Sequence, residues 1–262
     1  QFSGGIVGML SGNDAILNCH TVGEITSDKK YGYWIPIGGI VGGIYTFGNT
    51  TKSTMIYRCS SELYATALGS NSTTSGMIAS GILGDGYNTS VSCKLYIYDC
   101  SSNFNATATG ANYIGGVMGH GVTGGTSYVE NICCALDIDS STAPRGGALI
   151  GVFGGNYYLK NCYSEGLIGA NDTSKRSLYA VAGSVKLTTS NSNAININQV
   201  KIAGGYASYY SSMTNCLTNF SSQTHEYASG ELVESAAKTF FGSSPYSNIW
   251  DTSKIGGLYD PD

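Results

Sequence analysis

The chain has 262 residues, of which 37 are glycine and only 11% are charged, and its formal net charge at pH 7 is −4. The absence of a basic stripe argues against nucleic acid as a partner, and no apolar run approaches the roughly 20 residues of a membrane span. Hydrophobic residues make up 42% of the chain, which is enough for a packed core. Ser, Thr, Asn, Gly and the 20 tyrosines must therefore form most of the surface.

Two motifs occur together twice, once near the start of the chain and once after residue 145. GGIVG at 4–8 is followed by NCHTVGEI at 18–25, and GGALIG at 146–151 is followed by NCYSEGLI at 161–168. Both pairs fit a glycine motif, G-G-x-x-(x)-G, followed by N-C-x-[ST]-x-G-x-I. A shared spacing across two motifs indicates an internal repeat.

Further copies of the repeat lie between these two. The segments that start at Ile56 and Ile97, IYRCSSELYATALG and IYDCSSNFNATATG, are identical at nine of fourteen positions. The glycine starts are 31 to 39 residues apart, a period typical of solenoids, propellers and arrays. The glycine motif recurs at 38–42, more loosely at 75–78, again at 115–119 and weakly at 181–183.

The repeat units read as short strands. The glycine-bounded runs 4–8 and 38–44 are too short for helices. The segments 55–59 and 95–100 alternate apolar and polar residues, as half-buried strands do. Residues 184–214 depart from the pattern and read as an enlarged turn. We therefore predict an all-β chain, a parallel β-helix of about six irregular rungs over 1–226.

The last segment, 227–262, differs from the repeats and predicts a cap. Ser229 can cap a helix that places Leu232, Ala236 and Phe240 on one face. A short amphipathic helix followed by bulky aromatic residues would cover the end of a solenoid core. We treat this cap as part of the same structural unit.

The paired motifs resemble the GLUG repeat of bacterial and protist surface proteins. The ending ELVESAAKTFFGSSPYSNIWD, at 231–251, resembles the segment that commonly follows such repeats. The resemblance is strong at 4–25 and 146–168 and weak at 60–110 and after 184. It implies a parallel β-solenoid in an extracellular, often adhesive, protein.

Enzymatic function has little support in the sequence. The tightest acidic set is Asp137 and Asp139, with Arg145 six residues later, and it reads as the solvated face of a strand. His20, His120 and His225 lie in different repeats. We predict no catalytic residue, no cofactor and no metal site. A carbohydrate-active β-helix enzyme or a glycan-binding lectin is the alternative.

Exposed aromatic and polar residues leave sugar binding open. Tyr31, Tyr33 and Trp34 are candidates for stacking on a sugar ring, although such residues more often simply cover a β surface. The low charge and the cysteines, more than the sequons, favour an extracellular or cell-surface location, since several sequons are expected by chance in a chain rich in Asn, Ser and Thr. The N-glycan acceptors would be Asn49, Asn71, Asn88, Asn105, Asn171 and Asn219.

The cysteines recur at equivalent places in the repeat. Their alignment predicts that Cys59 lies over Cys100, and that Cys133 or Cys134 lies over Cys162. Neighbouring rungs are about 4.8 Å apart, within the Cα–Cα range of a disulfide. Disulfides and a stacked ladder of buried thiols both remain open.

The first repeat has no cap comparable to the C-terminal one. An open rung exposes core residues and unpaired strand edges. We expect Phe2, Ile6 and Val7 to form an assembly face that meets other protein subunits or upstream repeats of the same polypeptide. The sequence thus favours a non-enzymatic, glycosylated structural or adhesive protein in a larger surface assembly or filament.

Overall fold

The structure is a computed structural model of the chain. It describes residues 2–29, 34–46, 51–69, 77–86, 93–108, 113–122, 125–140, 145–147, 149–152, 156–165 and 168–170, and six short strands between 177 and 219. In these ranges every element of regular secondary structure is a β-strand. The cap predicted for 227–262 and the weak glycine copy at 181–183 lie outside them.

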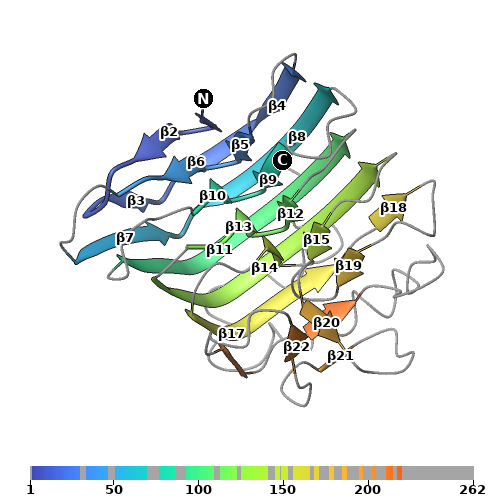
Figure 1. The fold of residues 1–262 in the computed structure, drawn as a ribbon. Helices are drawn as coiled ribbons and strands as arrows, with labels where there is room; N and C mark the ends of the chain where they lie inside the picture. The colour runs from blue at the N-terminus through green and yellow to red at the C-terminus, as the bar shows by residue number, and fades with distance from the viewer. Residues whose placement is uncertain are drawn as a thin grey trace, which may run out of the picture.

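Three sheets, here called A, B and C, contain most of the strands (Figure 1). Sheets A and B are built of short strands, and sheet C contains the long ones. Sheet A comprises β1 (Ser3–Gly4), β5 (Ile35–Gly38), β9 (Met77–Ser80), β12 (Tyr113–Gly115), β15 (Arg145–Gly147) and β19 (Ser177–Tyr179). Sheet B comprises β2 (Val7–Leu10), β6 (Val41–Ile44), β10 (Leu83–Asp85), β13 (Met118–His120) and β16 (Ile150–Val152).

Sheet C contains both long and short strands. Its long strands are β4 (His20–Lys29), β8 (Ser60–Gly69), β11 (Cys93–Ala108), β14 (Thr126–Ser140) and β17 (Asn156–Glu165). Its short strands are β3 (Ala15–Leu17), β7 (Lys52–Tyr57), β18 (Ile168–Ala170), β21 (Ile195–Asn196), β23 (Ser211–Thr214) and β24 (Leu217–Asn219). A separate antiparallel pair joins β20 (Val185–Leu187) and β22 (Ile202–Gly204).

The chain passes through sheets A, B and C in that order and then returns to sheet A. Each passage forms a layer that lies beside the previous one, so Figure 1 shows the colours in sequence from β2 and β4 to β17. The strands of adjacent layers pair in parallel from β1 to β19 in sheet A. The prediction of an all-β chain with parallel strands is confirmed for the described residues. The layers are 2–29, 34–69, 77–108, 113–140 and 145–170, numbered one to five.

The glycine motif forms the corner between sheets A and B. A Cβ atom at Gly38 would overlap the carbonyl oxygen of Val41 in its own corner and would lie 2.7 Å from the backbone nitrogen of Gly84. Gly4 and Gly115 are enclosed in the same way. A side chain therefore has no room at this position, because backbone surrounds it on two sides.

The register corrects two of the predicted glycine copies. Gly38 pairs with Ser80, so the motif of layer three is SGILG at 80–84 and not the segment 75–78. Gly115 pairs with Gly147, one residue after the predicted Gly146. These two copies were predicted at the wrong residues because Ser80 replaces the first glycine and because the connections between layers differ in length.

The Ser or Thr of the second motif ties each layer to the next. The hydroxyl of Thr21 donates to the carbonyl oxygen of Gly39 at 2.7 Å, and that of Ser102 donates to Gly116 at 2.8 Å. Ser61 makes the equivalent bond to Gly81. Both motifs therefore have a structural explanation, since the hydroxyl from sheet C satisfies a carbonyl that the glycine corner exposes.

Two buried clusters make up the described core. The first lies between sheet B and the beginning of the sheet C strands, and includes Leu83 and Ile97. The second lies between sheet A and the later part of those strands, and includes Ile37 and Phe104. In β11, Ser102 stands between the residues of the two clusters, which places its hydroxyl bond at the boundary between them.

Candidate functional site

A left-handed corner interrupts sheet C at the Asn-Cys motif. Asn18, Arg58, Asp99 and Asn131 have φ angles of 52°, 51°, 53° and 59°. Asn and Asp adopt this conformation more readily than other residues with a side chain, which explains the recurrent Asn. Arg58 is the exception, and its guanidinium lies 5.0 Å above the centre of the Tyr57 ring.

In layers one, two, three and five a cysteine occupies the position after the corner. Its thiol donates to the carbonyl oxygen two residues earlier in the chain, at 3.1 to 3.4 Å. The thiol therefore bonds to a carbonyl group next to the bend. The cysteines with this bond are Cys19, Cys59, Cys100 and Cys162.

Cys59 and Cys100 are neighbours, as predicted. Their flanking residues pair in register, and the backbone N–H of Cys59 donates to the Cys100 sulfur at 3.4 Å. The prediction for Cys162 is wrong, because Ile132 and neither Cys133 nor Cys134 is its partner. In layer four the corner residue is Asn131, so Ile132 takes the cysteine position and the two cysteines follow it.

None of the seven described cysteines forms a disulfide in the structure, and all but Cys19 are buried. Burial, together with a hydrogen bond to Cys59, raises the pKa of Cys100 well above its usual value. The same hydrogen bond lowers the pKa of Cys59 to about 6. Cys59 is nevertheless buried, and an inaccessible sulfur reacts slowly whatever its protonation state.

We expect iodoacetamide at pH 8 to alkylate Cys19 in the folded protein at least about ten times faster than Cys59 or Cys100. Denaturant should make all three react at similar rates. Intact-mass and peptide mass spectrometry would follow the reaction. Cys59 and Cys100 that resist alkylation even after unfolding, with a mass lower by two hydrogens, would instead identify a disulfide between them.

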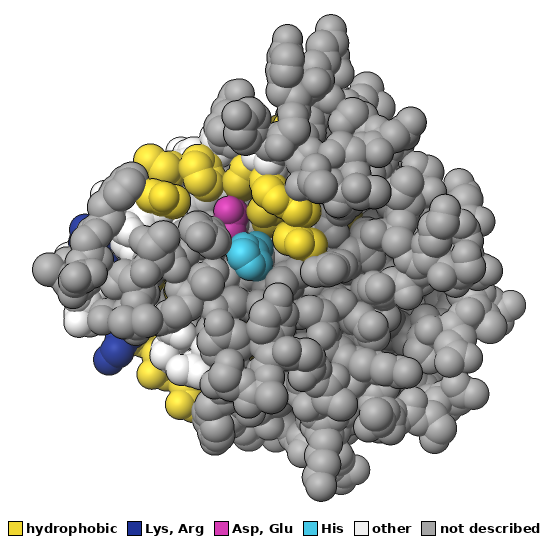
Figure 2. All heavy atoms as spheres, viewed as in Figure 1, with side chains coloured by type: hydrophobic (Ala, Val, Ile, Leu, Met, Phe, Trp, Pro, Cys, Tyr) yellow, Lys and Arg dark blue, Asp and Glu magenta, His cyan; other side chains and the backbone are white. Residues whose placement is uncertain are grey.

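A polar pair lies on the outer side of sheet B. Asp85 and His120 occupy paired positions on β10 and β13, and the His120 Nδ1 atom lies 3.0 Å from an Asp85 carboxylate oxygen. Their side chains are 11% and 18% exposed. Figure 2 shows a histidine and an acidic side chain side by side in a hollow with hydrophobic side chains around them.

Aromatic rings continue from this pair. The Tyr113 ring centre is 5.9 Å from that of His120, and Trp34 stacks on Tyr113 at 4.5 Å with an interplanar angle of 19°. On the other side of Asp85, a Cβ atom at Gly43 would meet the ring of Phe2. We call Phe2, Trp34, Asp85, Tyr113 and His120 the lateral site.

Sequence reasoning missed Asp85 and treated His120 as isolated. A usable signal existed, because each residue directly follows the last glycine of its glycine motif, Gly84 or Gly119. That signal required the correct register of layer three. Of the predicted sugar-stacking residues, Trp34 belongs to the site, while Tyr31 and Tyr33 lie outside the described residues.

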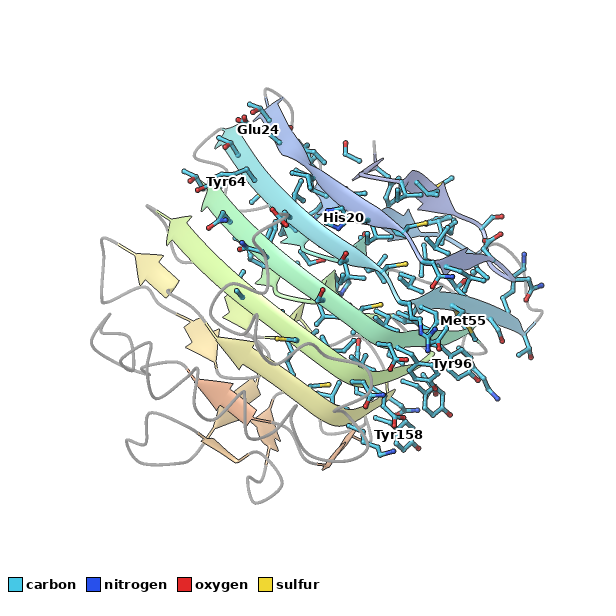
Figure 3. All side chains as sticks on the ribbon, turned by 180° about the vertical axis from the view of Figure 1, so that it is seen from behind. His20, Glu24, Met55, Tyr64, Tyr96 and Tyr158 are labelled. Atoms are coloured by element: carbon cyan, nitrogen blue, oxygen red, sulfur yellow. The ribbon has the colours of Figure 1, made fainter. Side chains whose placement is uncertain are left out.

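A stack of tyrosines crosses three layers on the outer face of sheet C (Figure 3). The ring centres of Tyr96 and Tyr128 are 5.0 Å apart, as are those of Tyr128 and Tyr158, with interplanar angles of 10° and 7°. The rings face one another, so this stack joins layers and has little ring face left for a sugar.

Within the described part of the chain, the outer edge of layer one has no partner strand. Strands β1, β2, β3 and β4 each pair with layer two, and among the described strands none pairs with their other edge. Several large apolar side chains of this layer are exposed. These are Ile6 at 43%, Met9 at 48%, Leu17 at 48% and Val22 at 62%.

The predicted assembly face agrees with this edge only in part. Ile6 is exposed, but Val7 packs partly against the first core cluster and Phe2 lies over Gly43. Met9, Leu17 and Val22 were not predicted. These side chains are exposed because they belong to the outermost described layer. The alternation of apolar and polar residues along one strand does not show which layer is outermost.

The remaining predicted residues are scattered. Asn105 lies in β11 between Tyr64 and Asp137, and its side chain is half-buried. For Asp137, Asp139, Arg145 and Asn219 only the strand is described. His20 lies 2.6 Å from the Ser60 hydroxyl. Outside the described residues are His225, Asn49, Asn71, Asn88 and Asn171.

The described ranges contain no group of three or more His, Cys, Asp or Glu side chains that could hold a metal ion. They also contain no helix of the length and apolar character required to cross a membrane. Compared with protein-family models, with curated proteins and with solved structures, the chain has no match.

Proposed function

We propose that this chain is a structural or adhesive segment of an extracellular, glycosylated surface assembly, built as a parallel β-solenoid and without catalytic activity. The six strands of sheet A, paired in succession, support a solenoid of about six rungs. The low charged fraction and the sequons support an extracellular location. The observation that carries the proposal is the open edge of layer one.

That edge is suited to a particular partner, a further rung of the same repeat. Within the described layers, Thr21, Ser61 and Ser102 each donate to a glycine carbonyl of the following layer. Gly5 occupies the corner position that Gly39 and Gly81 occupy, so a preceding rung with an inward Ser or Thr would complete the series. Its strands would pair in parallel with β1 to β4 and cover Leu17 and Val22.

The last strands that the structure describes are a poor match for this edge. Among them, β21 pairs with β24 in antiparallel orientation, and β20 pairs with β22 likewise. Because layer one needs parallel partners in all three sheets, head-to-tail stacking of a second copy fits less well. We therefore assign the covering rung to another repeat of this type in the same polypeptide.

The test adds such a rung. Ser3 pairs with Ile37 and Ile37 with Ala79, so Gln1 corresponds to Met77, and a copy of residues 34–76 fused directly before Gln1 keeps the register. The added rung should cover the exposed apolar residues and raise the thermal unfolding midpoint by about 5 °C or more. Binding of the dye ANS should fall.

The matched control is the same fusion in which the added copies of Ile37 and Ile56 are replaced by Asp. Ile37 and Ile56 themselves are fully buried in the original chain. This control should give no gain. A midpoint that is unchanged by the unmodified rung contradicts the proposal. If sedimentation shows that the original chain self-associates, and Val22→Lys abolishes this association, the partner of the open edge is a second copy of the chain.

Protein from its natural source should also carry N-glycan mass, and a mass equal to that of the unmodified chain would contradict the extracellular assignment.

A further inference from the structure

One N-glycosylation sequon lies within a long strand of sheet C. Its residues are Asn105, Ala106 and Thr107 of β11. Phe104 and Ala106 are buried in the core, so the alternation along the strand turns Asn105 and Thr107 to the outer face. Asn105 is half-buried there and Thr107 is exposed. Of the six predicted acceptors, the structure describes the side chain of Asn105 alone, and that side chain faces away from the core.

An exposed aromatic ring stands beside this sequon. Tyr64 of β8 pairs with Asn105 of β11, and Tyr64 is 60% exposed on the outer face of sheet C (Figure 3). In the described part of the chain, no aromatic ring stacks on Tyr64, and no group forms a hydrogen bond with the Asn105 side chain. The ring of Tyr64 and the amide nitrogen of Asn105 are therefore both accessible from the same side of the sheet.

Paired positions on this face bring side chains into contact. Parallel strands lie about 4.8 Å apart, and side chains stand roughly perpendicular to the sheet. Tyr96 and Tyr128 also occupy paired positions of adjacent layers on this face, and their ring centres are 5.0 Å apart. A sugar ring linked to the Asn105 nitrogen would rise beside the Tyr64 ring in the same way.

The first sugar of an N-glycan suits this position chemically. The donor of the glycan is an oligosaccharide linked through a diphosphate to a lipid. In the transfer, the Asn105 amide nitrogen bonds to C1 of N-acetylglucosamine, the bond from C1 to the diphosphate oxygen breaks, and the nitrogen loses one proton. The product is a neutral pyranose next to an exposed ring, and the apolar C–H face of a pyranose packs favourably on an aromatic ring.

We propose that Asn105 carries an N-glycan whose first N-acetylglucosamine packs its C–H face on the ring of Tyr64. The contact holds the glycan against sheet C and adds stability that the unmodified chain lacks. For the natural protein this inference rests on the proposed function, because an N-glycan requires the secretory route. Protein secreted from a chosen host tests the contact itself.

The experiment secretes the full chain from a eukaryotic cell line that makes only high-mannose glycans, and an endoglycosidase then trims each glycan to its first sugar. Peptide mass spectrometry should find N-acetylglucosamine on Asn105. The thermal unfolding midpoint should exceed that of Thr107→Val, which lacks the acceptor sequence, by about 2 °C or more. In a Tyr64→Ala background the same comparison should show no difference, whereas Tyr64→Phe should preserve it.

Two controls isolate the contact. The same variants made in a bacterium carry no glycan and give the effect of Thr107→Val alone. Glu24 pairs with Tyr64 on the side away from Asn105, so Glu24→Ala should leave the gain from the sugar unchanged. In NMR spectra of the trimmed protein, protons on the stacked face of the sugar should shift upfield, and Tyr64→Ala should remove this shift.

The possible failures are distinct. A secreted protein that is modified at other sequons but not at Asn105 contradicts the proposal, as does a gain in the unfolding midpoint that survives Tyr64→Ala. Neither result affects the extracellular assignment. If protein from its natural source lacks N-glycans at every sequon, the extracellular assignment fails and the natural glycan at Asn105 fails with it.

Discussion

Gly38→Ala should unfold the protein or lower its free energy of unfolding by about 3 to 5 kcal/mol. The added methyl group would overlap the Val41 carbonyl oxygen and lie 2.7 Å from the Gly84 nitrogen. Both are backbone atoms of paired strands, so neither can move without breaking the ladder between layers two and three. Urea denaturation followed by circular dichroism measures the loss.

Gly23→Ala is the matched control. Gly23 also belongs to a copy of the repeat motifs, but a Cβ atom there would meet nothing within 4 Å. This substitution should change stability by less than about 1 kcal/mol and could increase it, since alanine has less backbone freedom to lose on folding. Equal losses at the two positions would show that the tight corner is not what requires Gly38.

Phe104→Ala should cost about 3 to 5 kcal/mol of unfolding free energy. Phe104 is fully buried and belongs to the second core cluster, where it is the one aromatic member. Removing its ring leaves a cavity between sheet A and β11, and the ladders on both sides of β11 limit collapse. The same denaturation measurement applies.

The protein itself suggests the control for this change. Phe104 pairs with Leu63 in the layer before it and with Leu136 in the layer after it. Leucine is therefore compatible with this position, and Phe104→Leu should cost less than about 1.5 kcal/mol. A loss as large as that of the alanine variant would mean that ring shape, and not filled volume, stabilises the cluster.

The repeat was visible in the sequence because its motifs have strong local causes. Gly38 is required because its corner has no room for a side chain. Asn18, in the Asn-Cys pair, is favoured because its backbone is left-handed. Such requirements restrict the residue type wherever the corner recurs. They therefore indicated parallel strands and the neighbourhood of Cys59 and Cys100.

The register between layers was less accessible. The glycine motif of layer three was placed at the wrong residues because Ser80 stands where the other layers have glycine. The partner of Cys162 was predicted wrongly because Ile132 stands where the other layers have cysteine. Connections of different length join the layers, so counting residues along the chain does not give the register. Hydrogen bonding across all three sheets fixes it instead.

The sequence by itself determined the parallel β architecture, because glycine corners, left-handed bends and alternating strands are local properties. Only the tertiary structure decided which side chains from different layers meet. Asp85 and His120 are 35 residues apart, yet adjacent strands bring them within 3.0 Å. The exposure of Leu17 and Val22 likewise depends on which layer is outermost. Contacts between layers depend on register, and register is a property of the whole stack.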